Sequence, residues 1–169
     1  MVLTKAELLA ALQNEVRILL HLADKLDPLT LDYRPTPKQR STLELLRYLS
    51  IMGPTFVEYT ITGSQDPEIW NRAAAAAESR DFDQTKSAIA GQTDEYARLL
   101  RDVSDDELRK EHIGISGVST KGAVLVNLVL CGCAAYRTQL FLYLKACGRE
   151  DLTTMNLWAG MDAPAAAGS

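Results

Sequence analysis

Hydrophobic residues recur every three or four positions along most of the chain, which predicts amphipathic helices with one buried face each. In the first segment this stripe consists of Leu8, Leu12, Val16, Leu19, Ala23 and Leu26. Thr4 and Glu7 precede it with the spacing of a capping box, which satisfies backbone N–H groups of the first turn. Asp27-Pro28 ends this first predicted helix, and a proline-containing connector follows.

A second helix is predicted after a capping box formed by Ser41 and Glu44. Its apolar stripe consists of Leu45, Leu46, Leu49, Met52, Phe56 and Tyr59. Pro54 stands inside this helix, where a proline removes one backbone hydrogen bond and clashes with the preceding turn. We therefore expect a kink or a break at Gly53-Pro54.

Shorter elements are predicted between the second helix and the last one. Asp66-Pro67 is typical of a cap followed by proline at the first helical position, and an alanine-rich run continues it. A further helix is expected over residues 83–103 and a short helical turn over 104–110. The Gly-rich segment 112–122 shows no strand pair with turn chemistry, so we predict a loop with at most a brief extended piece.

The last long helix is predicted to begin near Ser119 or Thr120 and to end at Cys147, with Gly148 as a left-handed cap. Its residues are apolar nearly all round as far as Ala135. That pattern is typical of a buried helix, so we expect it to be the central and most buried one.

A short helical turn over 152–158 and a frayed tail over about 159–169 complete the chain. Together these elements predict an all-α protein that forms a four-helix bundle. Short extra helices are expected between the second and the last long helices. We predict a single domain over residues 1–169.

Composition and charge exclude several classes of protein. The 169 residues include 18 basic and 22 acidic side chains, for a net charge of −4, and no basic block supports nucleic-acid binding. The most apolar segment, 122–135, has about 14 residues, fewer than the roughly 20 that a membrane helix needs. The start lacks a signal-peptide pattern and the three cysteines lack a secreted disulfide framework, so we expect a cytoplasmic protein with no membrane partner.

Two separated segments resemble a known family. Residues 31–50 read LDYRPTPKQRSTLELLRYLS, and residues 128–148 read LVLCGCAAYRTQLFLYLKACG. The first is similar to the connector and Ser-capped second helix of the DinB-like superfamily, and the second is similar to its last helix. That superfamily includes metal-dependent thiol transferases and related isomerases, and the resemblance implies its four-helix bundle.

The resemblance also implies where a metal site would lie. Members of this superfamily use three histidines, two of them four residues apart on the last helix and one on the second helix, in an open site of the kind that catalytic metals occupy. In this chain those positions fall on Tyr48, Gly132 and Tyr136. A phenol with a pKa near 10 is a poor ligand at neutral pH, and glycine offers no side-chain ligand. We therefore expect no metal and no other cofactor.

Other metal-ligating residues are not placed to rebuild the site. Cys131 and Cys133 point roughly 200° apart on a helix, so they cannot chelate one ion and are interpreted as small hydrophobic residues. His21 lies off the apolar stripe of the first helix and is expected to face solvent. His112 falls in a loop and is expected at the surface.

Tyr48 and Tyr136 are expected to face one another across the position of the family's metal. Two alternatives stay open. Either the rings pack into the core with a phenol–phenol or phenol–backbone hydrogen bond, or they line a small pocket for which Gly132 leaves room. The possible neighbours of such a pocket are Met52, Glu58, Cys133 and Arg137.

Two further contacts are predicted from position alone. A buried Arg137 needs a partner, and Glu44 is a plausible one. Residues 158–162 could close over one end of the bundle, and Trp70 and Trp158 are interpreted as packing residues.

The sequence therefore predicts a DinB-like protein that has lost the metal site of its family. We expect it to bind a small apolar molecule or to serve as a structural or interaction protein, as a homodimer formed through bundle faces. The alternative is a metal-independent thiol transferase or isomerase-like enzyme, with Tyr48 or Tyr136 as general acid and Arg137 holding a carboxylate. A third hypothesis is a metal bound through Cys133 and His112. The sequence does not name a substrate.

Overall fold

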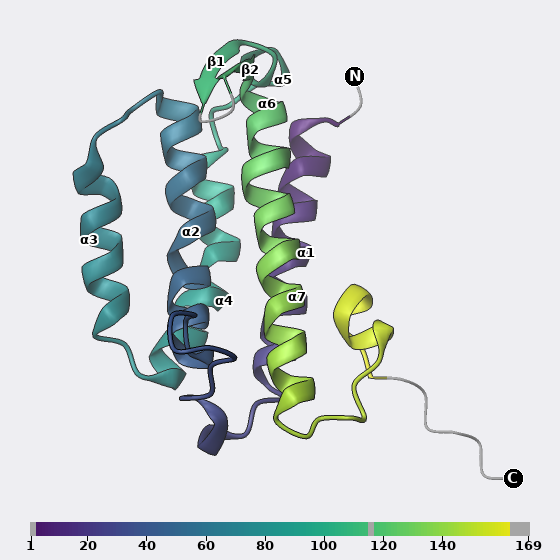
Figure 1. Cartoon of the computed structure of the whole chain (residues 1–169). Coiled ribbons are helices and arrows are strands. Elements are labelled where there is room, and N and C mark those ends of the chain that lie inside the picture. Colours follow the sequence, from purple (N-terminus) through teal and green to yellow (C-terminus); the bar gives the residue numbers. More distant parts are fainter. Residues whose placement is uncertain (1–2, 115–116, 163–169) are drawn as a thin grey trace, which may run out of the picture.

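The chain is mostly helical in the computed structural model, which describes residues 3–114 and 117–162 (Figure 1). The elements are α1 (Lys5–Ala23), a 3₁₀ turn (Pro28–Thr30), α2 (Thr42–Thr62), α3 (Pro67–Glu78), α4 (Phe82–Leu99), α5 (Asp105–Leu108), β1 (Glu111–Gly114), β2 (Gly117–Thr120), α6 (Lys121–Val124), a π-helical segment (Leu125–Leu130), α7 (Cys131–Ala146) and a C-terminal π turn (Met155–Ala159).

Four long helices form the bundle. Figure 1 shows α1, α2, α4 and the continuous helix from α6 through α7 running alongside one another, with α3 standing outside α2. Their apolar faces form one core, which includes Leu8, Leu12, Leu22, Leu45, Leu46, Met52, Ile89, Tyr96, Leu125 and Leu140. Of the residues of α3, Ala77 alone is buried. The predicted all-α four-helix bundle is confirmed.

Local capping chemistry places most helix ends where the sequence predicts them. Both capping boxes are present: Thr4 with Glu7 begins α1, and Ser41 with Glu44 begins α2. Gly63 ends α2 in the left-handed region, with φ of 71°. A residue with a Cβ is strained in that conformation, so glycine is favoured there.

Of the kink or break expected at Gly53-Pro54, the break is wrong, because α2 is one uninterrupted helix on both sides of Pro54, whereas the kink stays a prediction. Tertiary packing holds the helix together, since Met52 and Val57 are fully buried on either side of the proline. Gly53 contributes directly. A Cβ at this position would lie 1.9 Å from Oη of Tyr96, so only glycine lets the buried tyrosine of α4 pack this closely against α2.

The segment after α5 is an antiparallel hairpin, so the predicted loop is wrong. Glu111 pairs with Thr120 and Gly114 with Gly117. The Gly-rich composition hides the strand signal, because the alternating apolar residues that usually reveal a half-buried strand are few here. Ile113 and Val118 are each 66% exposed on this hairpin.

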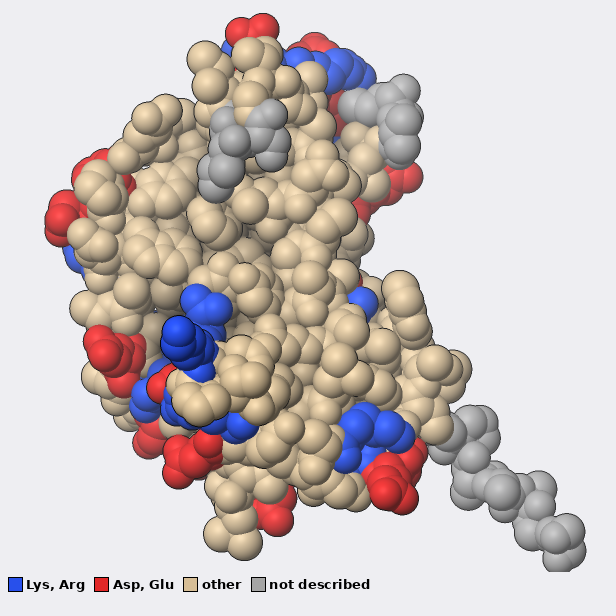
Figure 2. All heavy atoms as spheres, in the orientation of Figure 1, with Lys and Arg blue, Asp and Glu red and all other residues tan. Residues whose placement is uncertain are grey.

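The last helix is less buried than predicted. Only one side of it faces the core, whereas Asn127, Cys131 and Leu142 are exposed, and α2 carries the larger buried set. Figure 2 shows few charged side chains over the upper part of α2 and of α6–α7, with most charges nearer the margins. The prediction that the last helix is the most buried one is therefore wrong. A helix that is apolar on all sides gives no indication of which sides other helices cover.

By length and apolar composition, the helix Lys121–Ala146 could cross a membrane. Such a result for one helix is weak evidence, because a mostly buried core helix of a soluble protein passes the same test; here 22% of the most apolar window is buried. In this fold the helix packs along α1 and α2.

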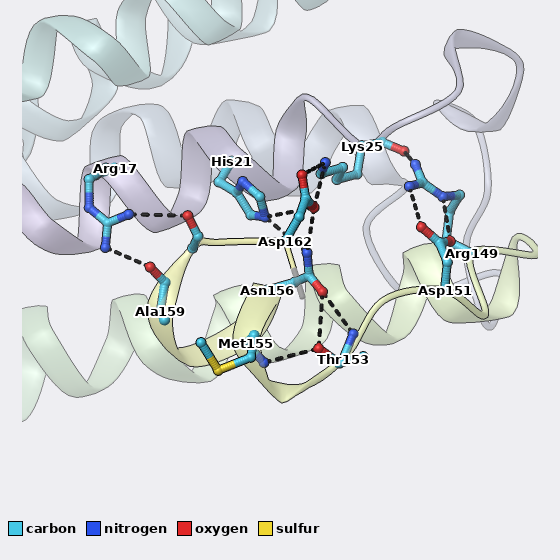
Figure 3. A network of polar contacts seen from close by, with 11 residues as sticks. Arg17, His21, Lys25, Arg149, Asp151, Thr153, Met155, Asn156, Ala159 and Asp162 are labelled. Carbon is cyan, nitrogen blue, oxygen red and sulfur yellow. Dashed lines mark hydrogen bonds and ion pairs between the residues drawn. The ribbon is translucent and has the colours of Figure 1, made fainter. Parts of the chain in front are cut away.

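The C-terminal segment 149–162 folds back along α1 instead of closing over an end of the bundle (Figure 3). Arg17 donates to the carbonyl oxygens of Ala159 and Gly160, at 2.7 and 3.2 Å. Lys25 forms an ion pair with Asp162 at 2.7 Å. Residues 159–162 are therefore held, and the rest of the predicted frayed tail, 163–169, lies outside the described residues.

His21 takes part in this attachment, so its predicted solvent-facing position is wrong. Its side chain is 17% exposed, and its Nε2 lies 3.0 Å from Nδ2 of Asn156. Asn156 Oδ1 accepts from the backbone N–H of Thr153 at 2.8 Å, so Nδ2 faces His21 as a donor. Trp158, in contrast, is 69% exposed, and its interpretation as a packing residue is wrong.

A pair of glycine substitutions tests the packing of α2 on α4. We expect Gly53→Ala to destabilise the fold by about 1–3 kcal/mol, because the new methyl group overlaps Tyr96. The matched control is Gly91→Ala in α4, where nothing lies within 4 Å of the added methyl. It should stabilise by about 0.5–1 kcal/mol. Urea unfolding of the two variants measures the change in the free energy of unfolding. An unchanged stability in Gly53→Ala would contradict the close approach of Tyr96 to Gly53.

The attachment of the C-terminal segment should weaken in acid. Burial, followed by the charge of Lys25, lowers the pKa of His21, although Asp162 and Asp24 oppose this and Arg17 adds to it. Protonation removes the acceptor for Asn156. When the segment is detached, His21 has its ordinary pKa of about 6.5. The contribution of His21 to the docking of the segment is therefore complete above this pH and is lost as the pH falls below it.

Hydrogen-exchange protection factors of residues 153–162, compared at pH 7.5 and pH 5, measure this release. We expect protection to fall in the wild type and to stay level in His21→Gln, which keeps an acceptor for Asn156 but does not titrate. Equal pH dependence in the two proteins would rule out His21 as the cause.

Candidate functional site

A row of aromatic rings runs along the outer face of α2. Tyr48, Phe56 and Tyr59 lie on this side of α2, with Tyr48 and Tyr59 about three helical turns apart. Trp70 of α3 lies between them, with its ring centroid 5.9 Å from that of Tyr48 and 5.6 Å from that of Phe56. Such aromatic pairs contribute about 0.5–1.5 kcal/mol each beyond their buried area.

Tyr59 ties the beginning of α3 to the end of α2. Its hydroxyl donates to the carbonyl oxygen of Asp66 at 2.9 Å and accepts from the backbone N–H of Trp70 at 3.2 Å. Both hydrogen-bonding functions of this phenol are thereby used. The arrangement sets the distance between α2 and the first turn of α3.

An open cleft of about 710 Å³ lies against this aromatic row. Its walls come from α2, the first turns of α3, strand β1 and the beginning of the last helix. The lining residues are Tyr48, Phe56, Tyr59, Thr60, Ser64, Gln65, Pro67, Trp70, Asn71, His112, Ile113, Val124 and Leu128. None of these is a lysine, arginine, aspartate or glutamate, so the cleft is aromatic, apolar and without permanent charge.

The last helix changes its winding beside the cleft. Residues Leu125–Leu130 form a π-helical segment within an otherwise α-helical run, and Leu128 of this segment lines the cleft. Single π turns inside α-helices are often found at functional sites. The apolar sequence of this segment gives no sign of the change in winding.

Lys121 fixes the base of the hairpin that forms the fourth wall. Its Nζ donates to the carbonyl oxygen of Ile61 at 2.9 Å and pairs with Glu107 at 2.7 Å. Hydrogen bonds from Lys110 and Lys121 lower the pKa of Glu107 to about 2, so this carboxylate is ionised at neutral pH. The hairpin is thereby held against the end of α2.

Comparison with known proteins identifies the architecture that holds this cleft. No family model matches the sequence, and no curated protein matches it. The structure is similar to the crystal structure of a DinB-like protein from Bacillus subtilis, with a TM-score of 0.65 over 86% of this chain and 94% of that one. This chain has a DinB-like fold. At 16% identity this similarity concerns the fold alone. The fold implied by the resemblance of residues 31–50 and 128–148 is confirmed.

In this DinB-like bundle the two predicted tyrosines do face one another. The rings of Tyr48 and Tyr136 pack edge to face, with centroids 4.9 Å apart. Burial, together with a hydrogen bond to Tyr136, raises the pKa of Tyr48 to about 12, although the Arg40 guanidinium lies 4.1 Å from its ring centroid and acts in the opposite direction. The space between the two rings is filled, as in the packed-core alternative.

The side chain nearest to Gly132 is that of Met52. A Cβ at Gly132 would lie 3.4 Å from the terminal methyl carbon of Met52, which is itself buried. The open space lies beside Tyr48, in the aromatic cleft. The cleft therefore adjoins the position expected from the family resemblance without coinciding with it.

Cys133 and Arg137 lie on a different side of the last helix. One residue further along a helix turns a side chain by about 100°, which points these two toward α1 and α4. They border a void of about 10 Å³ together with Glu15 and Tyr96. Burial raises the pKa of the Cys133 thiol to about 12, so the thiol is protonated at neutral pH.

Arg137 pairs with Glu15 at 3.0 Å, so the predicted pairing with Glu44 is wrong. Glu44 instead caps its own helix and pairs with Arg34 at 3.3 Å. The sequence shows which residue needs a partner, whereas the partner is decided by which helix packs beside it. Glu58, another suggested neighbour, borders a separate groove with Ile69.

The residues at the expected metal position do not fit a divalent ion. Tyr48 and Tyr136 offer phenols, which are poor ligands at neutral pH, Gly132 offers no side chain, and Met52 packs beside it. Within residues 3–114 and 117–162, no group of three His, Cys, Asp or Glu side chains is placed to hold a metal. Cys133 and His112 border different cavities, which disfavours a site shared by the two.

Substituting the buried ion pair tests the assignment of Glu15. We expect Arg137→Leu to destabilise the fold by roughly 3 kcal/mol, because it leaves the Glu15 carboxylate without its partner. The double variant Glu15→Leu with Arg137→Leu should recover much of that loss. Urea unfolding of the four proteins in the cycle measures the coupling, and additive losses would show that the two side chains do not interact.

Proposed function

We propose that this DinB-like protein binds a small, uncharged, largely apolar molecule in the aromatic cleft. One observation carries the proposal: a cleft of about 710 Å³ with several aromatic walls and, among the described residues that line it, no lysine, arginine, aspartate or glutamate. Small-molecule sites are typically concave, 300–1,000 Å³ in volume and mostly apolar, with few polar groups.

The chemistry of the walls favours binding by stacking and burial. Trp70, Phe56 and Tyr48 offer large apolar surfaces, and each Å² of apolar ligand surface removed from water contributes about 25 cal/mol. An ion would be disfavoured, because no opposite charge in the lining offsets the loss of its hydration. The ligand that fits is therefore neutral.

The enzyme alternative receives less support. Catalytic acids work best with a pKa near the operating pH, whereas that of Tyr48 is raised to about 12. Arg137, the proposed carboxylate holder, is committed to Glu15 on another side of the helix. The expected homodimer stays a prediction. One face that could form it is the exposed side of the last helix, which includes Cys131 and Leu142.

Binding can be measured through Trp70 after Trp158 is replaced. In Trp158→Phe the single remaining tryptophan lines the cleft, and titration with the uncharged probe N-phenyl-1-naphthylamine should quench it saturably. Adding Leu128→Arg places a charge in the cleft wall and should weaken binding at least about tenfold, the equivalent of 1.4 kcal/mol.

The control is Leu142→Arg, which adds the same charge at an exposed position of α7 away from the cleft. It should leave binding unchanged. Absence of saturable quenching, or equal weakening by both arginine variants, would exclude the cleft as the binding site.

A further inference from the structure

His112 is the one imidazole in the lining of the aromatic cleft, and its ring is uncommitted. It lies on β1 and is partly buried, and no hydrogen bond joins its ring to another side chain or backbone group in the described parts of the chain, 3–114 and 117–162. Of the other polar side chains of the lining, Gln65 is exposed to solvent, and three more form hydrogen bonds within the protein. Tyr59 uses both functions of its hydroxyl, Thr60 donates to the Phe56 carbonyl oxygen, and Asn71 donates to Glu68.

The position of His112 is fixed by the fold and not by a partner of its ring. It stands opposite Ser119 in the hairpin, whose base Lys121 holds to the end of α2. Its neighbour Ile113 lines the same cleft and is 66% exposed, so this wall presents an apolar side chain beside a free polar one. A polar group placed in an apolar site usually sets the orientation of the ligand.

We propose that the cleft selects flat aromatic molecules that carry one uncharged carbonyl group, whose oxygen accepts a hydrogen bond from the His112 imidazole. A neutral imidazole always has one N–H donor. Flat rings suit the walls formed by Trp70, Phe56 and Tyr48. A carboxylate is excluded by the same absence of positive charge that makes the cleft apolar. This inference rests on the proposed function and names the class of ligand for that site.

Matched ligands separate the carbonyl from the ring. The Trp158→Phe protein is titrated at pH 8 with 2-acetylnaphthalene and with 2-isopropenylnaphthalene, which has nearly the same shape but no oxygen. We expect the ketone to bind about fivefold more tightly, the scale of one hydrogen bond in a partly apolar site. The anion 2-naphthoate should bind more weakly than the ketone.

Variants at His112 then test the donor. His112→Phe should abolish the preference for the ketone while the hydrocarbon still binds, and His112→Gln, which keeps an N–H donor, should retain part of it. Equal affinity for ketone and hydrocarbon in the parent protein, an unchanged preference in His112→Phe, or tightest binding of 2-naphthoate would each overturn this inference. If neither neutral ligand binds, the proposed function itself fails.

Discussion

Helix α2 packs against neighbouring helices on two faces, and the positions of α3, α4 and the cleft depend on these contacts. Its inner face lies against α4, at a distance that Gly53 permits and Tyr96 occupies. Its outer face carries the aromatic row that α3 partly covers. Because it is held on both faces, α2 continues as one helix through Pro54. It is also the rigid wall against which a cleft can be preformed.

The sequence predicts what is decided locally and misses what is decided by neighbours. Both capping boxes act within one helical turn, so their predicted positions are correct. The pairing of Arg137 depends on which helix lies beside it, and the hairpin at β1 depends on Lys121 reaching α2. Neither relation is visible in residue spacing.

The site shows the same division. That Tyr48 and Tyr136 meet could be predicted, because the resemblance places both on facing helices. That the open volume lies beside Tyr48, along the aromatic row, could not, because it depends on how α3 packs outside α2 and on where the hairpin lies. The sequence predicts His112 in a surface loop, and only the folded hairpin brings it into the same cleft lining as Trp70.

One consequence follows from the way α3 is attached. This helix buries a single residue, Ala77, and packs on α2, with Tyr59 bonded to its first turn. Elements with so few buried contacts open locally at low free-energy cost. The width of the cleft therefore depends on a helix that buries little of its own surface in the core, and occupancy of the cleft and ordering of α3 are thermodynamically linked. Substitutions on the outer side of α3, far from any ligand, would thus tune affinity through the local unfolding equilibrium of this helix.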